Sequence, residues 1–428
     1  MYKLLLFGLF LFCQFVSNAQ TTIIHCGKLI DVDKGIVLNN KSIVVADGLI
    51  KSVEDGYITP KKDDKLIDLK SKTVMPGLMD MHVHVESESG PKRYEETFRE
   101  NESYVALRAT QFCERTLMAG FTTVRDLGGS GINVSLREAI KNGIIKGPRI
   151  YTCEKSIATT GGHADPTNGV RDNLKGDPGP KEGVINSPEE AAKAVRQRYK
   201  NGADCIKITS TGGVLSVASD GTGPQFTIEE IQAIVKTSND YNFVTAAHAH
   251  GTEGMKRAVL GGIHSIEHGT FMTEEVMDLM IEKGTYYVPT ISAGKFVADK
   301  AKTPNFYPKM IAKKAAEIGP QIQATFAKAY KRGVKIAFGT DSGVSLHGDN
   351  AKEFVFMVEA GMSPMESIQS ATKNAAQLMR IYNTSGSITS GKMADIIAVN
   401  ADPTQDINTM LNVVFVMKEG EVYKSEMK

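Results

Sequence analysis

The sequence predicts an α/β protein in which a (β/α)8 barrel carries a small β-sandwich built from both ends of the chain. Between residues 77 and 384, short apolar strands alternate with helical patterns, which is typical of a parallel barrel. Residues 20–76 and 385–428 instead contain strands separated by turns. We therefore expect residues 77–384 to form the barrel and the two flanking segments to pair in one composite β domain.

Residues 1–19 are typical of an export signal. Lys3 supplies a positive charge, residues 4–16 form an apolar core, and Ser17-Asn18-Ala19 has the small-x-small pattern that signal peptidase recognises. The apolar run is short for a membrane span, and no stop-transfer segment follows it. We expect cleavage after Ala19 and a mature protein that is periplasmic or secreted.

The charge balance excludes several classes of partner. The chain has 50 Lys or Arg against 49 Asp or Glu, and loss of the signal removes only Lys3 from these. A neutral chain without a basic run is poorly suited to bind nucleic acid or an anionic membrane surface. We expect a small-molecule or dipeptide substrate, no nucleic acid, no membrane span and assembly as a homo-oligomer.

The cysteines do not indicate a metal or redox motif. Outside the predicted signal they are Cys26, Cys113, Cys153 and Cys205, and none has C-x-x-C spacing. Four dispersed cysteines do not make a disulfide scaffold in a chain of this length, even in an exported protein. We expect buried free thiols.

The flanking segments and the barrel differ in their strand and helix signals. The flanks have strand patterns at 22–25, 42–45, 49–53, 391–399, 413–417 and 420–423, with a hairpin signal at Asp47-Gly48. Helices in the barrel region begin at Ser187 before Pro188, and at Thr227, whose spacing to Glu230 makes a capping box. A long helix is expected over about 309–331. The eight barrel strands are expected at 74–84, 120–126, 148–152, 204–208, 243–248, 263–268, 285–290 and 334–341.

Residues that can bind metals stand at the ends of these strands. The carboxyl ends of barrel strands meet at one mouth, where catalytic groups gather. His82 and His84 lie on one face of the first strand, because residues two apart in a strand project together. A single such pair is often structural, but further strands end in the same kinds of residue. These are Lys207, His248, His268 and Asp341. Imidazole and carboxylate ligands suit Zn2+ and similar ions.

Lys207 is unusual in this company, because an ammonium repels cations. Its neighbours Ile206 and Ile208 should face the helices, so Lys207 should point into the barrel. A desolvated lysine tends to lose its proton, and the neutral amine can take up CO2 as a carbamate that bridges two metals. The alternative for a lone barrel lysine is an ion pair with an inward-facing carboxylate.

Together these motifs resemble the amidohydrolase superfamily over nearly all of the mature chain. The similar segments are 76–84, 206–208, 265–269, 339–343 and 386–395, together with His248. Residues 123–129, 160–163 and 211–216 further resemble the branch related to imidazolonepropionase. That branch includes exported Xaa-Pro dipeptidases (prolidases), carboxypeptidases for basic residues and amidases for N-acyl amino acids. Imidazolonepropionase itself is a one-metal enzyme without the bridging lysine, so Lys207 favours a two-metal hydrolase.

The resemblance implies a role for each ligand. His82, His84 and Asp341 would hold one metal, His248 and His268 the second, and carboxylated Lys207 would bridge two divalent ions, with zinc expected. A hydroxide shared by the ions would attack the amide carbonyl. Asp341 would then act as general base and general acid.

Other polar residues carry weaker signals. His250 shares a strand face with His248, and His163 lies in a glycine-rich loop, so both are candidate substrate contacts. Asp80 and Asp126 are expected to hold strand ends or metal ligands in place. His347 is interpreted as a solvated loop histidine rather than a substrate contact.

The sequence thus favours a metal-dependent amidohydrolase that cleaves dipeptides, and by resemblance Xaa-Pro dipeptides. The alternative within this class is an amidase or carboxypeptidase acting on other N-acyl amino acids. The alternative of a different class is a non-catalytic metal-binding or scaffold protein. Such proteins usually lose ligands, whereas every ligand position is filled here.

Overall fold

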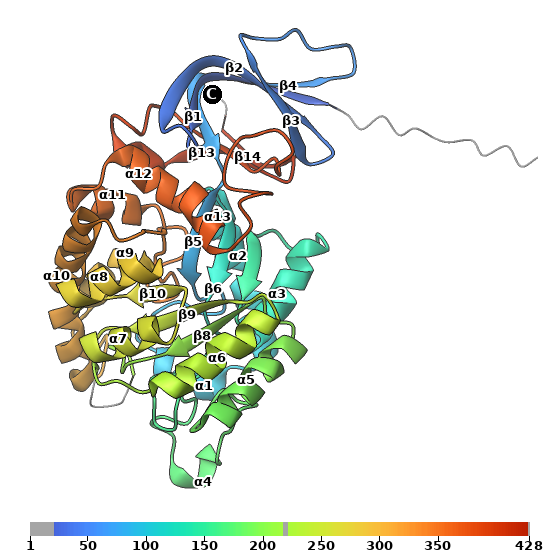
Figure 1. Cartoon of the computed structure of the whole chain (residues 1–428). Helices are drawn as coiled ribbons and strands as arrows, with labels where there is room; N and C mark the ends of the chain where they lie inside the picture. Colours follow the sequence, from blue (N-terminus) through green and yellow to red (C-terminus); the bar gives the residue numbers. More distant parts are fainter. Residues whose placement is uncertain (1–20, 217–220, 427–428) are drawn as a thin grey trace, which may run out of the picture.

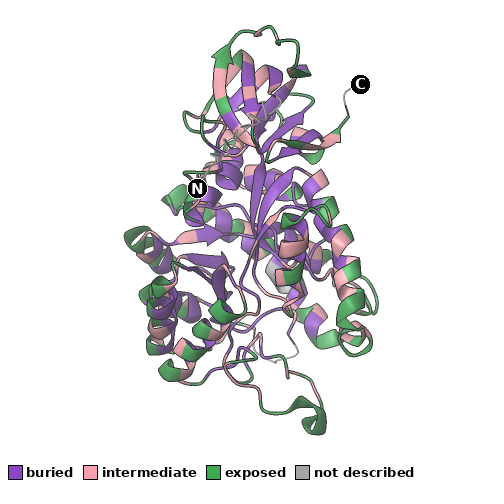
Figure 2. Cartoon of the chain, turned by 90° about the vertical axis from the view of Figure 1, so that its right-hand side faces the viewer, coloured by how far each residue is buried: buried purple, intermediate pink, exposed green. Residues whose placement is uncertain are grey.

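The computed structural model describes residues 21–216 and 221–426. The predicted export signal lies outside these described residues. A sheet domain stands at one end of the molecule, and a larger region of parallel strands covered by helices lies below it (Figure 1). Figure 2 shows that the strands of the larger region are buried, while exposed residues gather on the outer helices.

Both ends of the chain contribute to one β domain, as predicted, but this domain is one seven-stranded mixed sheet rather than the expected β-sandwich. Its strand order is β14-β13-β12-β4-β1-β2-β3, and β1 pairs parallel with β4 while its other strand pairs are antiparallel. It is a single sheet that curls round its own core, because Leu49 at its β3 edge also bridges Met393 just before β12. The strands are β1 Thr22–Asp31, β2 Ile36–Ala46, β3 Leu49–Asp55, β4 Lys65–Pro76, β12 Ile396–Val399, β13 Val413–Lys418 and β14 Glu421–Ser425.

Seven strands of the larger region pair in parallel in two groups. One group has the order β5-β6-β7 and the other β8-β9-β10-β11. Backbone hydrogen bonds join the two groups, since Asp204 N donates to Thr152 O over 2.7 Å. The strands are β5 Leu78–Val83, β6 Phe121–Asp126, β7 Arg149–Thr152, β8 Cys205–Thr209, β9 Val244–Ala249, β10 Ser265–His268 and β11 Tyr286–Val288.

The predicted eighth strand at 334–341 is irregular. Only Ile336 bridges β11 there, at Tyr287, while Met81 N and His84 N of the β5 segment donate to Phe338 O and Ser342 O over 2.9 and 2.7 Å. The segment therefore lies between β11 and β5 but forms no continuous ladder with either. The prediction of a regular strand here was wrong, although the segment occupies the expected place.

Helices follow the parallel strands and cover their outer side (Figure 1). Ser187 caps α5 beside Pro188, and Thr227 makes the predicted capping box with Glu230. The helices are α1 Arg93–Arg99, α2 Glu102–Met118, α3 Ile132–Lys141, α4 Asp172–Lys175, α5 Pro188–Lys200, α6 Ile228–Asp240, α7 Thr252–Leu260, α8 Glu274–Lys283, α9 Ile291–Lys300, α10 Lys309–Arg332, α11 Lys352–Glu359, α12 Pro364–Gln369, the π-helix η1 Ser370–Asn374, α13 Ala375–Leu378 and the 3-10 helix η2 Ile407–Leu411. Within the described residues, no helix is both long and apolar enough to cross a membrane.

The sheet domain and the parallel strands meet at Gly77, between β4 and β5. Gly77 N donates to Asp395 O over 2.8 Å, and a Cβ at Gly77 would lie 2.3 Å from Thr122 Oγ1. Arg149 of β7 donates to Asp395 Oδ2 over 2.9 Å. Glycine is therefore required at Gly77, after Pro76, because the two parts of the molecule approach closely there.

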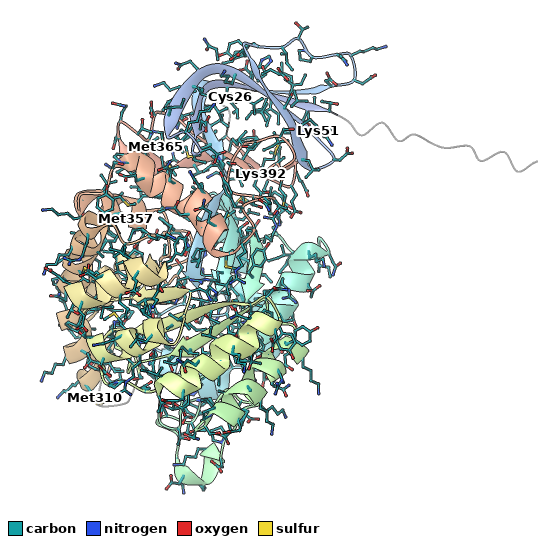
Figure 3. The ribbon with its side chains drawn as sticks, viewed as in Figure 1. Cys26, Lys51, Met310, Met357, Met365 and Lys392 are labelled. Atoms are coloured by element: carbon teal, nitrogen blue, oxygen red, sulfur yellow. The ribbon has the colours of Figure 1, made fainter. Side chains whose placement is uncertain are left out.

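Methionines pack in the buried core, and the cysteines agree with the sequence prediction. Met357 of α11 is fully buried and Met365 of α12 packs against the same core (Figure 3). Cys26 lies in the sheet domain in that view, and the four cysteines of the described chain are buried and free. The prediction of buried free thiols is confirmed.

Loss of the capping box should destabilise α6. Thr227→Ala removes the hydroxyl that accepts from Glu230 N and should lower the free energy of unfolding by about 1 kcal/mol. Thr273→Ala at the start of α8 is the matched control, because Thr273 is also an exposed N-cap but makes no side-chain capping bond. Urea-induced unfolding of both variants checks this, and equal effects would contradict it.

Candidate active site

A cavity of about 680 Å³ opens at the carboxyl ends of the parallel strands. All eight predicted site residues line it. They are His82, His84, His163, Lys207, His248, His250, His268 and Asp341. The strand order thus brings together residues that lie far apart in the sequence.

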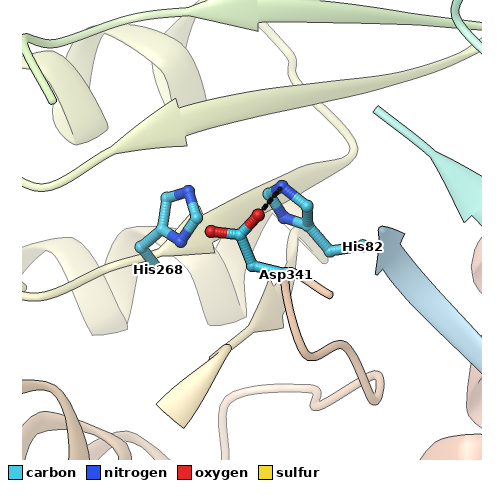
Figure 4. Close-up of side chains that lie close together, drawn as sticks. All are labelled: His82, His268 and Asp341. Carbon is cyan, nitrogen blue, oxygen red and sulfur yellow. Dashed lines mark ion pairs between the residues drawn. The ribbon is translucent and has the colours of Figure 1, made fainter. Parts of the chain in front are cut away.

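His82, His268 and Asp341 form the tightest group in the cavity. One ligand atom from each lies within 4.8 Å of the others. In Figure 4 the Asp341 carboxylate lies between the two rings, and its ion pair with His82 spans 3.6 Å. The three side chains could hold one metal ion.

Asp341 also approaches His84, whose Nε2 lies 3.3 Å from Asp341 Oδ1. Burial raises the pKa of the Asp341 carboxyl, but its interactions with His82, His84 and Lys207 outweigh this effect and lower that pKa. Burial lowers the pKa of His84, but the carboxylate of Asp341 outweighs this effect and raises that pKa. Asp341 is therefore an anion among imidazoles.

Lys207 is buried on β8 with its Nζ 3.3 Å from His82 Nε2. In the part of the chain that the structure describes, no carboxylate lies within ion-pair distance of it. Burial lowers the pKa of Lys207, although Glu267 and Asp341 raise it. The ion-pair alternative considered for this lysine therefore has no partner here.

Hydrogen bonds set the proton position on three of the histidines. His82 Nδ1 donates to Glu267 Oε2 over 2.9 Å, and His84 Nδ1 donates to Gly128 O over 2.8 Å. His248 Nε2 donates to Gly212 O over 3.1 Å. Each ring therefore turns its other nitrogen away from this bond as a candidate ligand atom, which is the usual arrangement in metal sites.

A buried polar layer lies beneath these residues. Glu267 Oε1 accepts from Arg125 Nη2 over 2.8 Å, and both side chains are fully buried. Asp80 accepts from the backbone nitrogens of His82 and Thr340, and burial raises its pKa to about 6. Asp80 therefore holds two strand ends, as expected.

Sequence reasoning missed the roles of Arg125 and Glu267. Both residues lie in motifs that were recognised, and Glu267 stands directly before His268. The sequence feature that could have revealed them is a charged residue at an inward-facing strand position. A buried charge at such a position needs a partner of opposite charge.

Asp126 and His347 also support the site, because both contact the loop that follows β5. Asp126 accepts from Val85 N, Asn133 and Thr152, so it holds the loop after β5 as expected. His347 is buried against Phe112, and its Nε2 donates to the carbonyls of His84 and Ser87. Its interpretation as a solvated residue was wrong, because its ring supports the backbone of the His84 loop.

His163 and His250 complete a cluster of rings. His163 stacks on His248 with ring centroids 4.3 Å apart, and His250 stacks on His268 at 5.0 Å. Burial lowers the pKa of His163 to about 3 and that of His250 to about 4. Both rings are therefore neutral groups that can offer or accept a hydrogen bond in the cavity.

The donor set fits a metal centre. Asp341 Oδ1 is buried and accepts no hydrogen bond, which is rare for a carboxylate oxygen without a cation nearby. Burial lowers the pKa of His82, of His248 and of His268, so these neutral rings could serve as ligands. Nitrogen and oxygen donors of this kind suit Zn2+ and related ions.

Comparison with known proteins gives the family. Residues 73–423 match the amidohydrolase family. The chain belongs to the amidohydrolase family. It is accordingly a hydrolase that acts on amide or peptide bonds, and metal ions are typical of this family.

Individual relatives cover nearly the whole of this amidohydrolase. A crystal structure of a Xaa-Pro dipeptidase with bound methionine is 54% identical, with a TM-score of 0.92, and the match covers 95% of this chain and 100% of that one. Ochratoxinase of Aspergillus niger is 33% identical over 95% of this chain and 88% of its own. Imidazolonepropionase of Treponema denticola is 26% identical over 87% of this chain and 88% of its own. The predicted resemblance is confirmed.

Gly213→Ala should displace His163 without removing any of the candidate metal ligands. A Cβ at Gly213 would lie 2.2 Å from His163 Cε1, so the ring must leave its stack on His248. Activity should fall to the level of His163→Ala, and the double variant should lose no more, because both changes remove one contact.

Steady-state kinetics and metal analysis check this, with Gly90→Ala as the control because its added Cβ would meet nothing within 4 Å. Additive losses, or loss of bound metal in Gly213→Ala, would contradict the assignment.

Proposed function

We propose that this amidohydrolase is a binuclear metal-dependent dipeptidase that cleaves Xaa-Pro dipeptides. The observation that carries the proposal is its 54% identity to a Xaa-Pro dipeptidase over 95% of the chain. The six proposed ligands all line the cavity, which supports a catalytic protein over a scaffold that has lost its metals.

The proposal also covers the fold of the two domains and the cellular location of the enzyme. We infer that β5–β11 and the segment 334–341 form a (β/α)8 barrel over residues 77–384, and that residues 20–76 and 385–428 form the sheet domain. The hydrogen bonds of Met81 and His84 to the eighth segment support closure. We also propose export to the periplasm or beyond, on the signal pattern of residues 1–19.

The proposed ligands divide between two divalent ions, and zinc suits their chemistry. His82, His84 and Asp341 would hold one ion, and His248 and His268 the other. Lys207, as a carbamate, would bridge them, which its burial and its lack of a carboxylate partner support. When bound, the ions would lower the pKa of water and polarise the amide carbonyl.

The side chains of the cavity supply the proton transfers. Asp341 would accept the proton of the attacking water and deliver it to the leaving amine, which is a poor leaving group without it. The lowered pKa of Asp341 keeps its carboxylate ionised and therefore available as a proton acceptor. His163 and His250, both neutral at pH 7, would contact the substrate, and a neutral ring can donate a hydrogen bond to the carbonyl oxygen.

The cavity wall beside α9 supports proline as the leaving residue. Ala293, Gly294 and Val297 of α9 and Ile322 of α10 present a buried apolar surface. A Cβ at Gly294 would lie 2.7 Å from Ile322 Cγ2, so the wall is already packed behind the cavity. An apolar wall suits a pyrrolidine ring, which has no polar side-chain atom.

An amidase or carboxypeptidase for other N-acyl amino acids remains the second candidate. It is favoured by the 33% identity to ochratoxinase, a relative with a different named activity. The same metal ligands would serve both reactions. The two candidate functions are therefore distinguished by which substrates the enzyme cleaves.

Release of amino acids from a dipeptide library, with zinc supplied, tests the proposal. Wild type should release proline from Xaa-Pro members. Lys207→Ala should lose activity by more than about 100-fold, the upper end for residues that only support a ligand. Added acetate should restore part of it, because a small carboxylate fits the vacated space.

The outcomes are distinct. Lys256→Ala, at an exposed lysine of α7, is the control and should keep full activity. Cleavage of N-acyl amino acids but not Xaa-Pro would establish the amidase instead. An unchanged Lys207→Ala enzyme would refute the role of Lys207, and no hydrolysis by zinc-loaded wild type would refute both candidates.

Metal removal should destabilise the protein as well as inactivate it. Ligands that bind only the folded state stabilise it by ~4 kcal/mol at a concentration 1,000 times their Kd. A chelator should therefore lower the melting temperature, and added zinc should restore both stability and hydrolysis. Calorimetry with and without the chelator checks this, and an unchanged melting temperature would contradict a metal centre inside the fold.

A further inference from the structure

Thr290 stands at the start of α9 but does not cap that helix. Threonine is a preferred N-cap residue, and Ser187, Thr227 and Ser363 each cap their own helices with a side-chain oxygen. Thr290 instead has a φ of 54° and a ψ of 42°, and its side chain makes no capping bond. Such left-handed backbone is unfavourable for a β-branched residue, so the surrounding structure must hold Thr290 in place.

The hydroxyl of Thr290 faces the candidate metal site. Its Oγ1 lies 2.8 Å from His268 Nδ1, and both residues line the cavity. A hydroxyl that accepts from Nδ1 keeps the proton of the ring on that nitrogen and leaves the lone pair on Nε2. The rings of His82 and His84 have the same arrangement, because their Nδ1 atoms also face oxygen acceptors.

Glu353 of α11 caps α9 in place of Thr290. Its Oε1 accepts from Ile291 N over 2.8 Å, and its Oε2 accepts from Ser292 N over 2.7 Å and from Ser292 Oγ over 2.6 Å. The side chain is fully buried, and burial raises its pKa to about 7, whereas the three donors favour the ionised carboxylate. A carboxylate here also meets the positive end of the α9 dipole. The cap of α9 therefore comes from another helix.

The start of α9 affects the site in two ways. Thr290 N donates to Gly339 O over 3.1 Å, so the partner of His268 is also attached to the segment that carries Asp341. The following turns of α9 form the apolar wall of the cavity. A shift of the first turn of α9 would therefore move the hydrogen-bond partner of His268 and the wall together.

We propose that Glu353 is a positioning residue for the metal site. By capping α9 it leaves the hydroxyl of Thr290 to accept from His268 Nδ1, and Nε2 of that ring becomes the ligand atom. This inference rests on the proposed metal-dependent function, because His268 is one of the proposed ligands. Glu353 is not among the residues that line the cavity, so it acts through Thr290 and α9.

Titration of the metal-free protein with zinc tests the role of Thr290. Thr290→Val keeps the shape of the side chain but removes the hydroxyl, and it should weaken zinc binding by about 10- to 100-fold. Thr290→Ser keeps the hydroxyl and should bind zinc as tightly as wild type. The matched control is Thr273→Val at the start of α8, an exposed N-cap without a side-chain capping bond, which should leave zinc binding unchanged.

The same titration tests Glu353. Glu353→Gln should weaken zinc binding by a similar factor and should also raise KM, because the wall on α9 shifts with Thr290. The double variant with Thr290→Val should bind zinc no more weakly than the weaker single variant, since both changes remove one contact. Glu359→Gln is the matched control, because Glu359 also joins α11 to α9 but does so at the surface, through Lys295.

Nitrogen NMR of the metal-free protein gives a readout that requires neither metal nor activity. His268 should carry its proton on Nδ1 in wild type and should distribute it over both nitrogens in Thr290→Val. Wild-type zinc affinity in Thr290→Val, or additive losses in the double variant, would overturn this inference and leave the proposed function intact. Failure of wild type to bind zinc would overturn the proposed function and this inference with it.

Discussion

The arrangement of the site depends on the buried ion pair between Arg125 of β6 and Glu267 of β10. Glu267 also accepts from His82 Nδ1, and Arg125 Nε donates to Met81 O over 2.6 Å, so the pair ties three strands together beneath the cavity. Removing one partner of a buried pair typically costs about 3–5 kcal/mol, because the other charge is left uncompensated. The same contact fixes the proton of His82 and turns its free nitrogen toward Asp341.

Above this ion pair, the side chains of the site offer more hydrogen-bond acceptors than donors. Burial lowers the pKa values of His82, His248 and His268, which are therefore neutral, and Asp341 is the anion among them. One nitrogen of a neutral imidazole carries the proton and donates it in a hydrogen bond. The other nitrogen carries a lone pair, and these lone pairs face one another in the cavity. Such a group is poorly compensated by itself and becomes favourable when a cation takes those lone pairs.

Strand periodicity and resemblance to a known family were enough to predict which residues line the cavity, the pairing of the two chain ends and the free cysteines. They could not predict how His268 and Asp341 reach the cavity. Ser265 and Glu267 face inward, so simple alternation would turn His268 outward, but its φ of 70° redirects it, and Asp341 has a φ of 57°. The irregular segment at 334–341 was missed for a related reason, because its strand-like composition does not reveal that its ladder is interrupted.

Loops line the part of the cavity where we propose that the substrate binds. The contacts between these loops follow no period in the sequence. The ring of His163 fits a hollow that only Gly213 leaves open, Tyr94 bonds to Leu215, and Lys314 bonds to Gly213 and Ser216. Loops after three different strands therefore support one another. A substitution in one of these loops therefore affects contacts with the others, whereas the proposed metal ligands lie on strand ends that the buried polar layer holds. A change in these loops can thus alter which substrate the cavity accepts while the residues at the strand ends stay in place.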